Sequence, residues 1–171
     1  MKIAFKYGVV IGLALAGWDI WTNEYLYNTL FGRAPFIFQL GLLLLGLFLG
    51  IWEFKKVKYA NKITFGAATF SGIQISVIAA LVFSISSFIY YQNASYRFDE
   101  YSIRETIRVA KEKNASPKDM KQIEEMVQMT RAAETPANKA KGALLVTAIL
   151  GLLFSLIFAA ILRNTEPVRL T

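Results

Sequence analysis

Polar residues within apolar segments are the first candidates for chemistry, because an ionisable group in lipid is costly and marks a functional site by default. Asp19 is the single ionisable residue well inside such a segment. Gln39 is expected at a similar depth and Arg33 nearer the rim. No run of carboxylates marks a proton or ion path through the segments, so we expect a structural contact of Asp19 with Arg33 or Gln39 rather than proton or cation binding.

Gln74 is the deepest amide of the third apolar segment. An amide is costly to leave unpaired in apolar surroundings, which predicts a hydrogen bond across helices to Thr147 or Ser155. The serines of the same segment can bond the carbonyl one turn back in their own helix, so they need no other partner. A solute-binding role is the alternative for Gln74.

Cysteine and histidine are both absent from the 171 residues. Their absence excludes disulfides, thiol nucleophiles, His- or Cys-ligated haem and ordinary zinc sites. It also removes the commonest general base near neutral pH. We therefore expect no enzymatic activity, no metal and no cofactor. A membrane-embedded enzyme would need converging carboxylates, whereas Asp19 and Glu24 are predicted at the membrane face opposite Glu53.

Four long hydrophobic segments are the elements that must position these residues. The chain is 55% hydrophobic, and a helix needs about 20 mostly apolar residues to cross the hydrocarbon core. Soluble helices are apolar on one face, whereas these segments are apolar all round. The sequence predicts an all-α integral membrane protein with one membrane domain over residues 1–171 and spans at about 5–25, 34–52, 63–91 and 142–162.

The first segment also resembles a signal peptide, the alternative to a permanent span. Lys2 and Lys6 are typical of the basic start of such a peptide, and residues 14–16 read Ala-Leu-Ala, as at a cleavage site. Apolar residues nevertheless continue beyond this point to Trp21. We expect an uncleaved span.

Small residues recur at every fourth position of the spans. In lipid, helices associate through close backbone approach rather than by hiding leucine from leucine. A helix turns about 100° per residue, so such a row drifts about 40° per step and can face more than one neighbour. We expect the rows to pack helices within this chain, in a second copy or in another protein. The rows are Ala4, Gly8, Gly12 and Ala16; Gly46 and Gly50; Ala68, Gly72, Ser76, Ala80 and Ser84; and Ala143, Thr147, Gly151, Ser155 and Ala159.

Residues 92–141 are the one polar segment of any length. The pattern predicts an amphipathic helix over about 98–113 and a second helix that begins at the N-cap Ser116, followed by Pro117. Thr135 and Pro136 are expected to cap the start of a last helix that continues into the fourth span. Methionine suits adaptable binding surfaces, so the second helix offers a candidate partner surface; packing on the first loop helix or on the membrane rim is the favoured alternative. The surface comprises Met120, Ile123, Met126 and Val127.

Basic residues orient the predicted spans. The termini and the loop between the second and third spans hold eight Lys or Arg residues against two Glu, whereas the long loop holds ten against eight acidic residues. The density of basic residues in short loops places both termini in the cytoplasm and residues 92–141 outside it. The net charge of +7 is dispersed around the spans rather than striped, so we expect no nucleic-acid partner.

The order of these features resembles a family of four-span inner-membrane proteins of unknown function found mainly in Bacteroidota. Lys6-Tyr7-Gly8 opens the first span, and a lysine-rich loop leads into the sequence Ile-Thr-Phe-Gly-Ala-Ala at 63–68. A third span bearing Ser and Tyr, a helical outer loop and a small-residue fourth span follow. The resemblance implies a multi-pass protein of the bacterial inner membrane with both termini cytoplasmic. It brings no established activity and no catalytic residues.

The function expected from these observations is that of a non-enzymatic accessory or structural subunit that packs laterally in a membrane protein complex. Its partners would be membrane lipid and either other membrane protein subunits or a second copy. The alternative is a small transporter or channel for a solute or ion, which would use Gln74, the serines and Asp19. A water-filled path between the spans would favour the transporter, and a dry, leucine-filled centre would count against it.

Overall fold

Helices make up almost all of the part of the chain that the structure describes. The computed structural model describes residues 2–27, 35–94 and 96–164, without the side chain of residue 98, and no strand occurs among them. The predicted all-α class is confirmed. The elements are α1 (Lys2–Trp21), the π-helix η1 (Thr22–Leu26), α2 (Pro35–Lys58), α3 (Phe65–Tyr91), α4 (Arg97–Glu112), α5 (Pro117–Ala133) and α6 (Pro136–Leu162).

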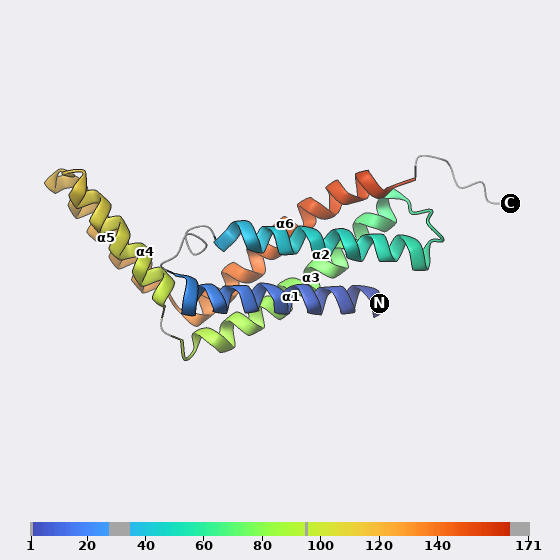
Figure 1. Ribbon diagram of the computed structural model, residues 1–171, viewed down its shortest axis with the longest axis horizontal. Coiled ribbons are helices and arrows are strands. Elements are labelled where there is room, and N and C mark those ends of the chain that lie inside the picture. Colours follow the sequence, from blue (N-terminus) through green and yellow to red (C-terminus); the bar gives the residue numbers. More distant parts are fainter. Residues whose placement is uncertain (1, 28–34, 95, 165–171) are drawn as a thin grey trace.

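Four of these elements are long and apolar enough to cross a membrane: α1 with η1, α2, α3 and α6. They run antiparallel to their neighbours in the chain, so α1 begins and α6 ends at the same end of the bundle (Figure 1). We call this the terminal end. The opposite end, where α4 and α5 project beyond the bundle as a helical hairpin, is the hairpin end.

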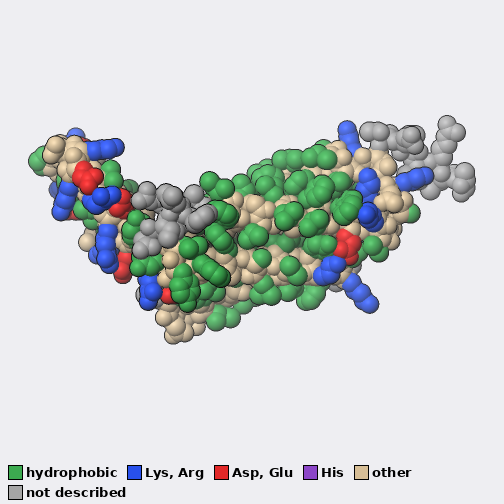
Figure 2. All heavy atoms as spheres, viewed as in Figure 1, with side chains coloured by type: hydrophobic (Ala, Val, Ile, Leu, Met, Phe, Trp, Pro, Cys, Tyr) green, Lys and Arg blue, Asp and Glu red, His purple; other side chains and the backbone are tan. Residues whose placement is uncertain are grey.

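The lateral surface of the bundle is apolar. Hydrophobic side chains cover it between the two ends, while charged side chains gather at the ends and on the hairpin (Figure 2). Large apolar side chains point outward on all four helices, among them Phe5, Leu45, Ile85 and Leu153. Such an all-round apolar surface suits a multi-pass membrane protein.

The centre of the bundle is filled by aliphatic side chains. Leu47, Ile51 and Ile75 are completely buried where α2 meets α3. They belong to one cluster of buried residues that also draws on α1 and α6. Close packing of this kind leaves few voids larger than a water molecule.

The small-residue rows of α3 and α6 face each other along the most extensive helix contact of the described chain. A Cβ atom placed on Gly151 would lie 2.4 Å from the Cβ of Ser76, and one on Gly72 would lie 2.6 Å from the Cβ of Ser155. Both distances are far below ordinary van der Waals separation. The glycines are thus what allows these two backbones to approach.

The row of α1 also packs on α3. A Cβ atom on Gly12 would lie 2.6 Å from the Cβ of Val82 and 2.8 Å from the carbonyl oxygen of Ala79. The glycines of α2 turn inward as well, Gly46 against Ile11 and Gly50 against Ile75. Most row residues are therefore buried in contacts within one chain. The neighbouring residue of each of these glycines is identified by the structure.

Two buried serines in the seam between α3 and α6 bond to their own helices, whereas Ser84 of α3 donates across the seam to the Ala140 carbonyl of α6 at 2.9 Å. The Ser76 hydroxyl donates to the Gly72 carbonyl at 2.8 Å, and the Ser155 hydroxyl donates to the Gly151 carbonyl at 2.5 Å. Gln74 lies elsewhere: it lines a groove between α1 and α3 together with Lys2 and Phe5. The expected bond from Gln74 to Thr147 or Ser155 is therefore wrong, because Gln74 faces α1 while the row of α3 faces α6.

Candidate functional site

The hairpin is held to the end of the bundle by charged and aromatic contacts. Lys139 at the start of α6 donates to the carboxylate of Asp99 in α4, and both side chains are mostly buried. Arg97 lies 3.4 Å from the Glu24 carboxylate of η1. The pairing of Lys139 with Asp99 joins the last span to the hairpin.

Tyrosines complete this junction. The Tyr90 hydroxyl donates to Glu24 at 2.5 Å and accepts from the buried Asn23 amide at 2.7 Å. The rings of Tyr91 and Tyr96 stack with centroids 5.2 Å apart, and the Tyr96 hydroxyl donates to the Tyr91 carbonyl. The end of α3 is thereby tied to both the π-helix and the hairpin.

The π-helix itself shapes this end of the first span. The regular helix α1 ends at Trp21, and residues Thr22–Leu26 continue it with wider turns. A π-helical turn is rare and often occurs at a functional site. Here it carries the buried side chains of Thr22 and Asn23 toward the space beneath the hairpin.

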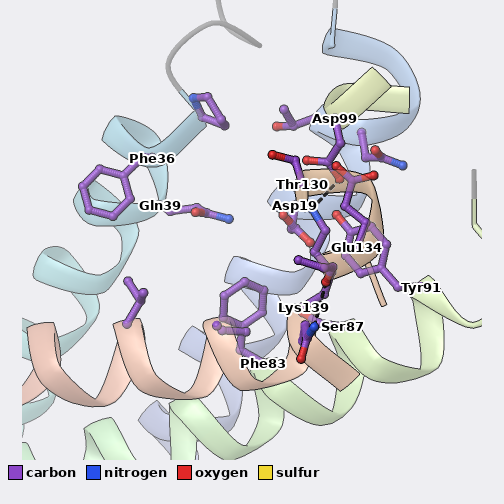
Figure 3. Close-up of a pocket in the computed structure, with 18 residues that line it drawn as sticks. Asp19, Phe36, Gln39, Phe83, Ser87, Tyr91, Asp99, Thr130, Glu134 and Lys139 are labelled. Carbon is purple, nitrogen blue, oxygen red and sulfur yellow. Dashed lines mark hydrogen bonds and ion pairs between the residues drawn. The ribbon is translucent and has the colours of Figure 1, made fainter. Parts of the chain in front are cut away.

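A cavity of about 500 Å³ opens in that space, which we call the hairpin-end cavity (Figure 3). Its walls come from α1 with η1, from α2, α3, α4, α6 and the end of α5. Its apolar lining residues include Phe36 and Phe83. Its polar lining residues are Asp19, Thr22, Asn23, Gln39, Ser87, Asp99, Thr130, Glu134, Asn138 and Lys139.

Negative charge exceeds positive charge in this wall. Asp19, Asp99 and Glu134 contribute three carboxyl groups, and Lys139 is the only cationic side chain among the described lining residues. Lys139 is already paired with Asp99, and its ammonium lies 5.3 Å from the centroid of the Tyr91 ring. The cavity therefore keeps an excess of acceptor groups.

The surroundings of Glu134 disfavour its charged form. Burial raises the pKa of Glu134, and the negative charge of Asp99 raises it further, while Lys139 acts in the opposite direction.

Two polar atoms of this wall lack a partner. Thr22 is only 3% exposed, and its hydroxyl oxygen makes no hydrogen bond in the described structure. One carboxyl oxygen of Glu134 is likewise buried without a hydrogen bond. An unsatisfied buried polar atom costs about 1–3 kcal/mol, so both atoms call for an explanation beyond packing.

The arrangement offers hydrogen-bond acceptors rather than a metal site. Among the described residues, no group of three or more carboxylates is close enough together to hold a metal ion. Figure 3 shows the labelled polar side chains of the cavity, among them Asp19, Asp99 and Glu134. The wall holds both acceptors, in its three carboxyl groups, and donors, in the side-chain amides of Asn23, Gln39 and Asn138.

The sequence analysis placed two of these residues together and missed the rest. Asp19 and Gln39 line one cavity, whereas Arg33 lies outside the described residues. Asp99, Glu134 and Lys139 belong to the polar segment, where acidic and basic residues alternate as on a solvated surface. Only the predicted helix start at Thr135 could have hinted that Glu134 and Lys139 lie at the membrane end.

The apolar side chains of the methionine-bearing helix α5 differ in burial: some pack within the hairpin and others are exposed. Val127 is buried, as are Ile103 and Ala110 of α4, and these residues form the seam of the hairpin. Met120 and Ile123 are half-buried, whereas Met126 and Met129 are 54% and 73% exposed. Of the candidate partner surface, Met126 alone is strongly exposed among the described side chains, beside the exposed Met129 that the prediction left out, and Val127 packs within the hairpin.

A second polar cluster lies at the terminal end. The Lys6 ammonium reaches both carboxylate oxygens of Glu53 at 2.7 and 2.8 Å, and the Tyr7 hydroxyl donates to the same carboxylate at 2.7 Å. Charge-assisted hydrogen bonds of this length are strong. Both oxygens of the Glu53 carboxylate are hydrogen-bonded, so this cluster joins α1 to α2.

Comparison with known proteins adds a family. No curated protein and no solved structure matches the chain. The family model described as a protein of unknown function (DUF4199) matches residues 6–164, nearly the whole chain, and the chain belongs to that family.

Proposed function

We propose that this protein is a non-enzymatic accessory subunit of a membrane protein complex, and that it meets its partner through the hairpin end. The four spans, as the resemblance noted above implies, would lie in the inner membrane of a bacterium of the Bacteroidota. The observation that carries the proposal is the α4–α5 hairpin, which projects beyond the bundle and exposes Met126 and Met129.

The contacts of the small residues within the chain favour the hairpin, rather than the sides of the spans, as the surface that meets the partner. Gly8, Gly12, Gly72 and Gly151 all face helices of the same chain. Lateral association through these rows, which the sequence favoured, would therefore have to break contacts already made. The exposed methionines, by contrast, are free of helix packing, and flexible thioether side chains suit a protein-binding surface.

The orientation rests on charge. At the terminal end, the loop between α2 and α3 and the start of α1 carry lysines, including Lys2, Lys55, Lys58 and Lys62. Basic residues in short loops favour the cytoplasmic side. The proposal therefore places the terminal end in the cytoplasm and the hairpin outside it.

A transporter or channel is supported less well. The described centre of the bundle is aliphatic, and the buried serines bond to carbonyl groups of their own helices. Gln74 lies on the α1–α3 groove rather than along an axis shared with Asp19. These polar residues do not outline one path through the described spans.

The test is the mass of the protein after gentle solubilisation from its native membrane. We expect the wild-type protein in an assembly heavier than one chain with its detergent. Replacing Met126 and Met129 by Ser is expected to release the chain as a monomer. Val57→Ser makes the same chemical change at an exposed position of the terminal end and is expected to leave the assembly intact.

Two results would overturn the proposal. A wild-type monomer with no partner bound would contradict the role of accessory subunit. An assembly that survives the double methionine substitution would remove the hairpin as the contact surface. Circular dichroism of each variant would show that the helices are retained, so that loss of the assembly reports on the surface rather than on unfolding.

A further inference from the structure

We propose that the hairpin-end cavity binds an ammonium group, carried either by a small amine or by a lipid headgroup. The inference stands apart from the accessory-subunit proposal, because it concerns the cavity between hairpin and bundle and not the exposed methionines. It rests on the charge, the unpaired acceptors, the size and the position of the cavity.

Charge is the first argument. Asp19, Asp99 and Glu134 face a space in which Lys139 is the only described cation. Like charges that share a cavity repel one another, and the charge of Asp99 disfavours ionisation of Glu134. A bound cation would relieve that repulsion, since an opposite charge nearby favours the ionised form of a carboxyl group.

The unpaired acceptors supply the second argument. The Thr22 hydroxyl and one Glu134 carboxyl oxygen are buried without hydrogen bonds, and Thr22 is only 3% exposed. Both residues line the cavity. Each unpaired atom is covered by neighbouring protein atoms, so a ligand in the cavity would reach it after a rotation of the side chain; an ammonium group carries up to three N–H donors and no acceptor to satisfy it. These two atoms distinguish the cavity from an ordinary solvated group of acidic residues.

The ammonium group of Lys139 does not bond to the unpaired atoms of Thr22 and Glu134. Its ammonium donates to Asp99 and lies 5.3 and 5.7 Å from the ring centroids of Tyr91 and Tyr96. These contacts hold it at the junction of α6 with the hairpin. Thr22 and Glu134 therefore keep their unpaired atoms even with the lysine in place.

Size and lining favour an organic cation over a metal ion. The volume of about 500 Å³ falls within the range of small-molecule sites, about 300–1,000 Å³. Phe36 and Phe83 give the cavity apolar lining residues that suit a hydrocarbon tail, and aromatic faces attract organic cations. No described trio of carboxylates is close enough for a metal.

The position of the cavity admits two sources of the ammonium group. It lies at the end of the spans, where Trp18, Trp21 and Tyr90 gather, and such aromatic residues are typical of the level of lipid headgroups. A phosphatidylethanolamine headgroup could therefore reach it from the membrane. A free amine could reach it from the aqueous side, because the cavity is open rather than enclosed.

The experiment titrates the full-length protein in neutral detergent with 2-phenylethylammonium and, separately, with 2-phenylethanol, which has a similar shape and no charge. We expect the wild-type protein to bind the ammonium compound and not the alcohol. Glu134→Gln is expected to weaken binding at least tenfold. Glu53→Gln, which alters the hydrogen-bonded carboxylate at the terminal end, is expected to bind as the wild type does.

A second variant guards against a folding defect. Thr22→Val removes the unpaired hydroxyl while keeping the shape of the side chain, and it is also expected to weaken binding. Equal binding of the alcohol and the ammonium compound would overturn the proposal. So would unchanged affinity in both Glu134→Gln and Thr22→Val, or a loss in Glu53→Gln as large as that in Glu134→Gln.

The lipid arm uses nanodiscs of phosphatidylethanolamine or phosphatidylglycerol and native mass spectrometry of the released protein. Selective retention of phosphatidylethanolamine by the wild-type protein, lost in Glu134→Gln, would identify the headgroup as the source. Binding of the small amine without selective lipid retention would identify a free amine. The absence of both would refute an ammonium site.

Discussion

The packed middle of the bundle and the hairpin-end cavity treat polar atoms in opposite ways. In the middle, Ser76 and Ser155 complete their hydrogen bonds within their own helices, and glycines bring the backbones together. At the hairpin end, Thr22 and Glu134 each keep a buried polar atom without a partner. The buried serines of the first region are hydrogen-bonded within the protein, whereas the second region keeps polar atoms that are unpaired.

This difference separates stability from binding. Packing through small residues does not tolerate a larger side chain, because a single added methyl group would clash with the neighbouring helix. The wall of an open cavity tolerates a change of side-chain volume, whereas its neighbouring carboxyl groups repel one another when they are ionised. Substitutions in the two regions should therefore affect different measurements, and the following predictions rank them from the largest effect to the smallest.

Gly12→Ala should be the most destabilising of these changes. The new Cβ would lie 2.6 Å from the Cβ of Val82 and 2.8 Å from the Ala79 carbonyl oxygen, which forces α1 away from α3. Overpacking costs about 1–3 kcal/mol, so the midpoint of thermal unfolding in detergent should fall. Gly17→Ala is the control in the same helix, because its Cβ would meet nothing within 4 Å; an equal fall in both variants would contradict the packing described.

Asp99→Asn should have a smaller effect. It removes the carboxylate that pairs with Lys139; both side chains are mostly buried. The link between α6 and the hairpin is weakened as a result. We expect a loss of about 1 kcal/mol, since the hydrogen bond is charge-assisted but lies beside other carboxyl groups. Hydrogen exchange of the α4 backbone would report it, with the exposed Glu124→Gln as control. Unchanged exchange in Asp99→Asn would argue against this link.

Glu53→Gln tests the terminal end. Its ion pair with Lys6 is half-exposed, and pairs of this kind contribute about 0–1 kcal/mol. The unfolding midpoint should therefore shift less than in Gly12→Ala. A larger destabilisation would mean that the polar cluster at the terminal end, rather than the glycine contacts, holds α1 in place.

Glu134→Gln is expected to shift stability least and in the opposite direction. A pKa raised in the folded state makes the carboxyl group favour the folded protein at low pH, and this contribution is lost as the pH rises through the folded-state pKa. The amide cannot ionise, so the variant should be slightly more stable than the wild type at neutral pH. The advantage should vanish on acidification below the ordinary pKa of glutamate. An advantage that persists at low pH would contradict the assigned cause.

Much of the helical framework could be predicted from local sequence. The Ser116 hydroxyl accepts from the Asp119 backbone N–H, and Thr135 accepts from Asn138, as their positions at helix starts indicate. Span lengths follow from apolar composition, although α2 continues beyond residue 52 to Lys58. That extension escaped prediction because the lysines at its end are exposed and carry no apolar signal.

The candidate site could be predicted only in part, because it depends on long-range contacts. Asp19 stands out in the sequence as an isolated charge, but Asp99 and Glu134 lie far along the chain among alternating charges. Their convergence follows from how the hairpin sits on the bundle. The small-residue rows show a similar limit, since spacing identifies Gly72 and Gly151 as packing residues but not as each other's neighbours.

The most direct test of the separation between packing and binding is the shift of the unfolding midpoint by 2-phenylethylammonium, measured in Gly12→Ala and Glu134→Gln side by side. Ligand that binds only the folded state raises the midpoint. We predict a low midpoint with an intact ligand-induced shift for Gly12→Ala, and a midpoint near that of the wild type with no shift for Glu134→Gln. A shift that survives in Glu134→Gln, or disappears in Gly12→Ala, would contradict the account.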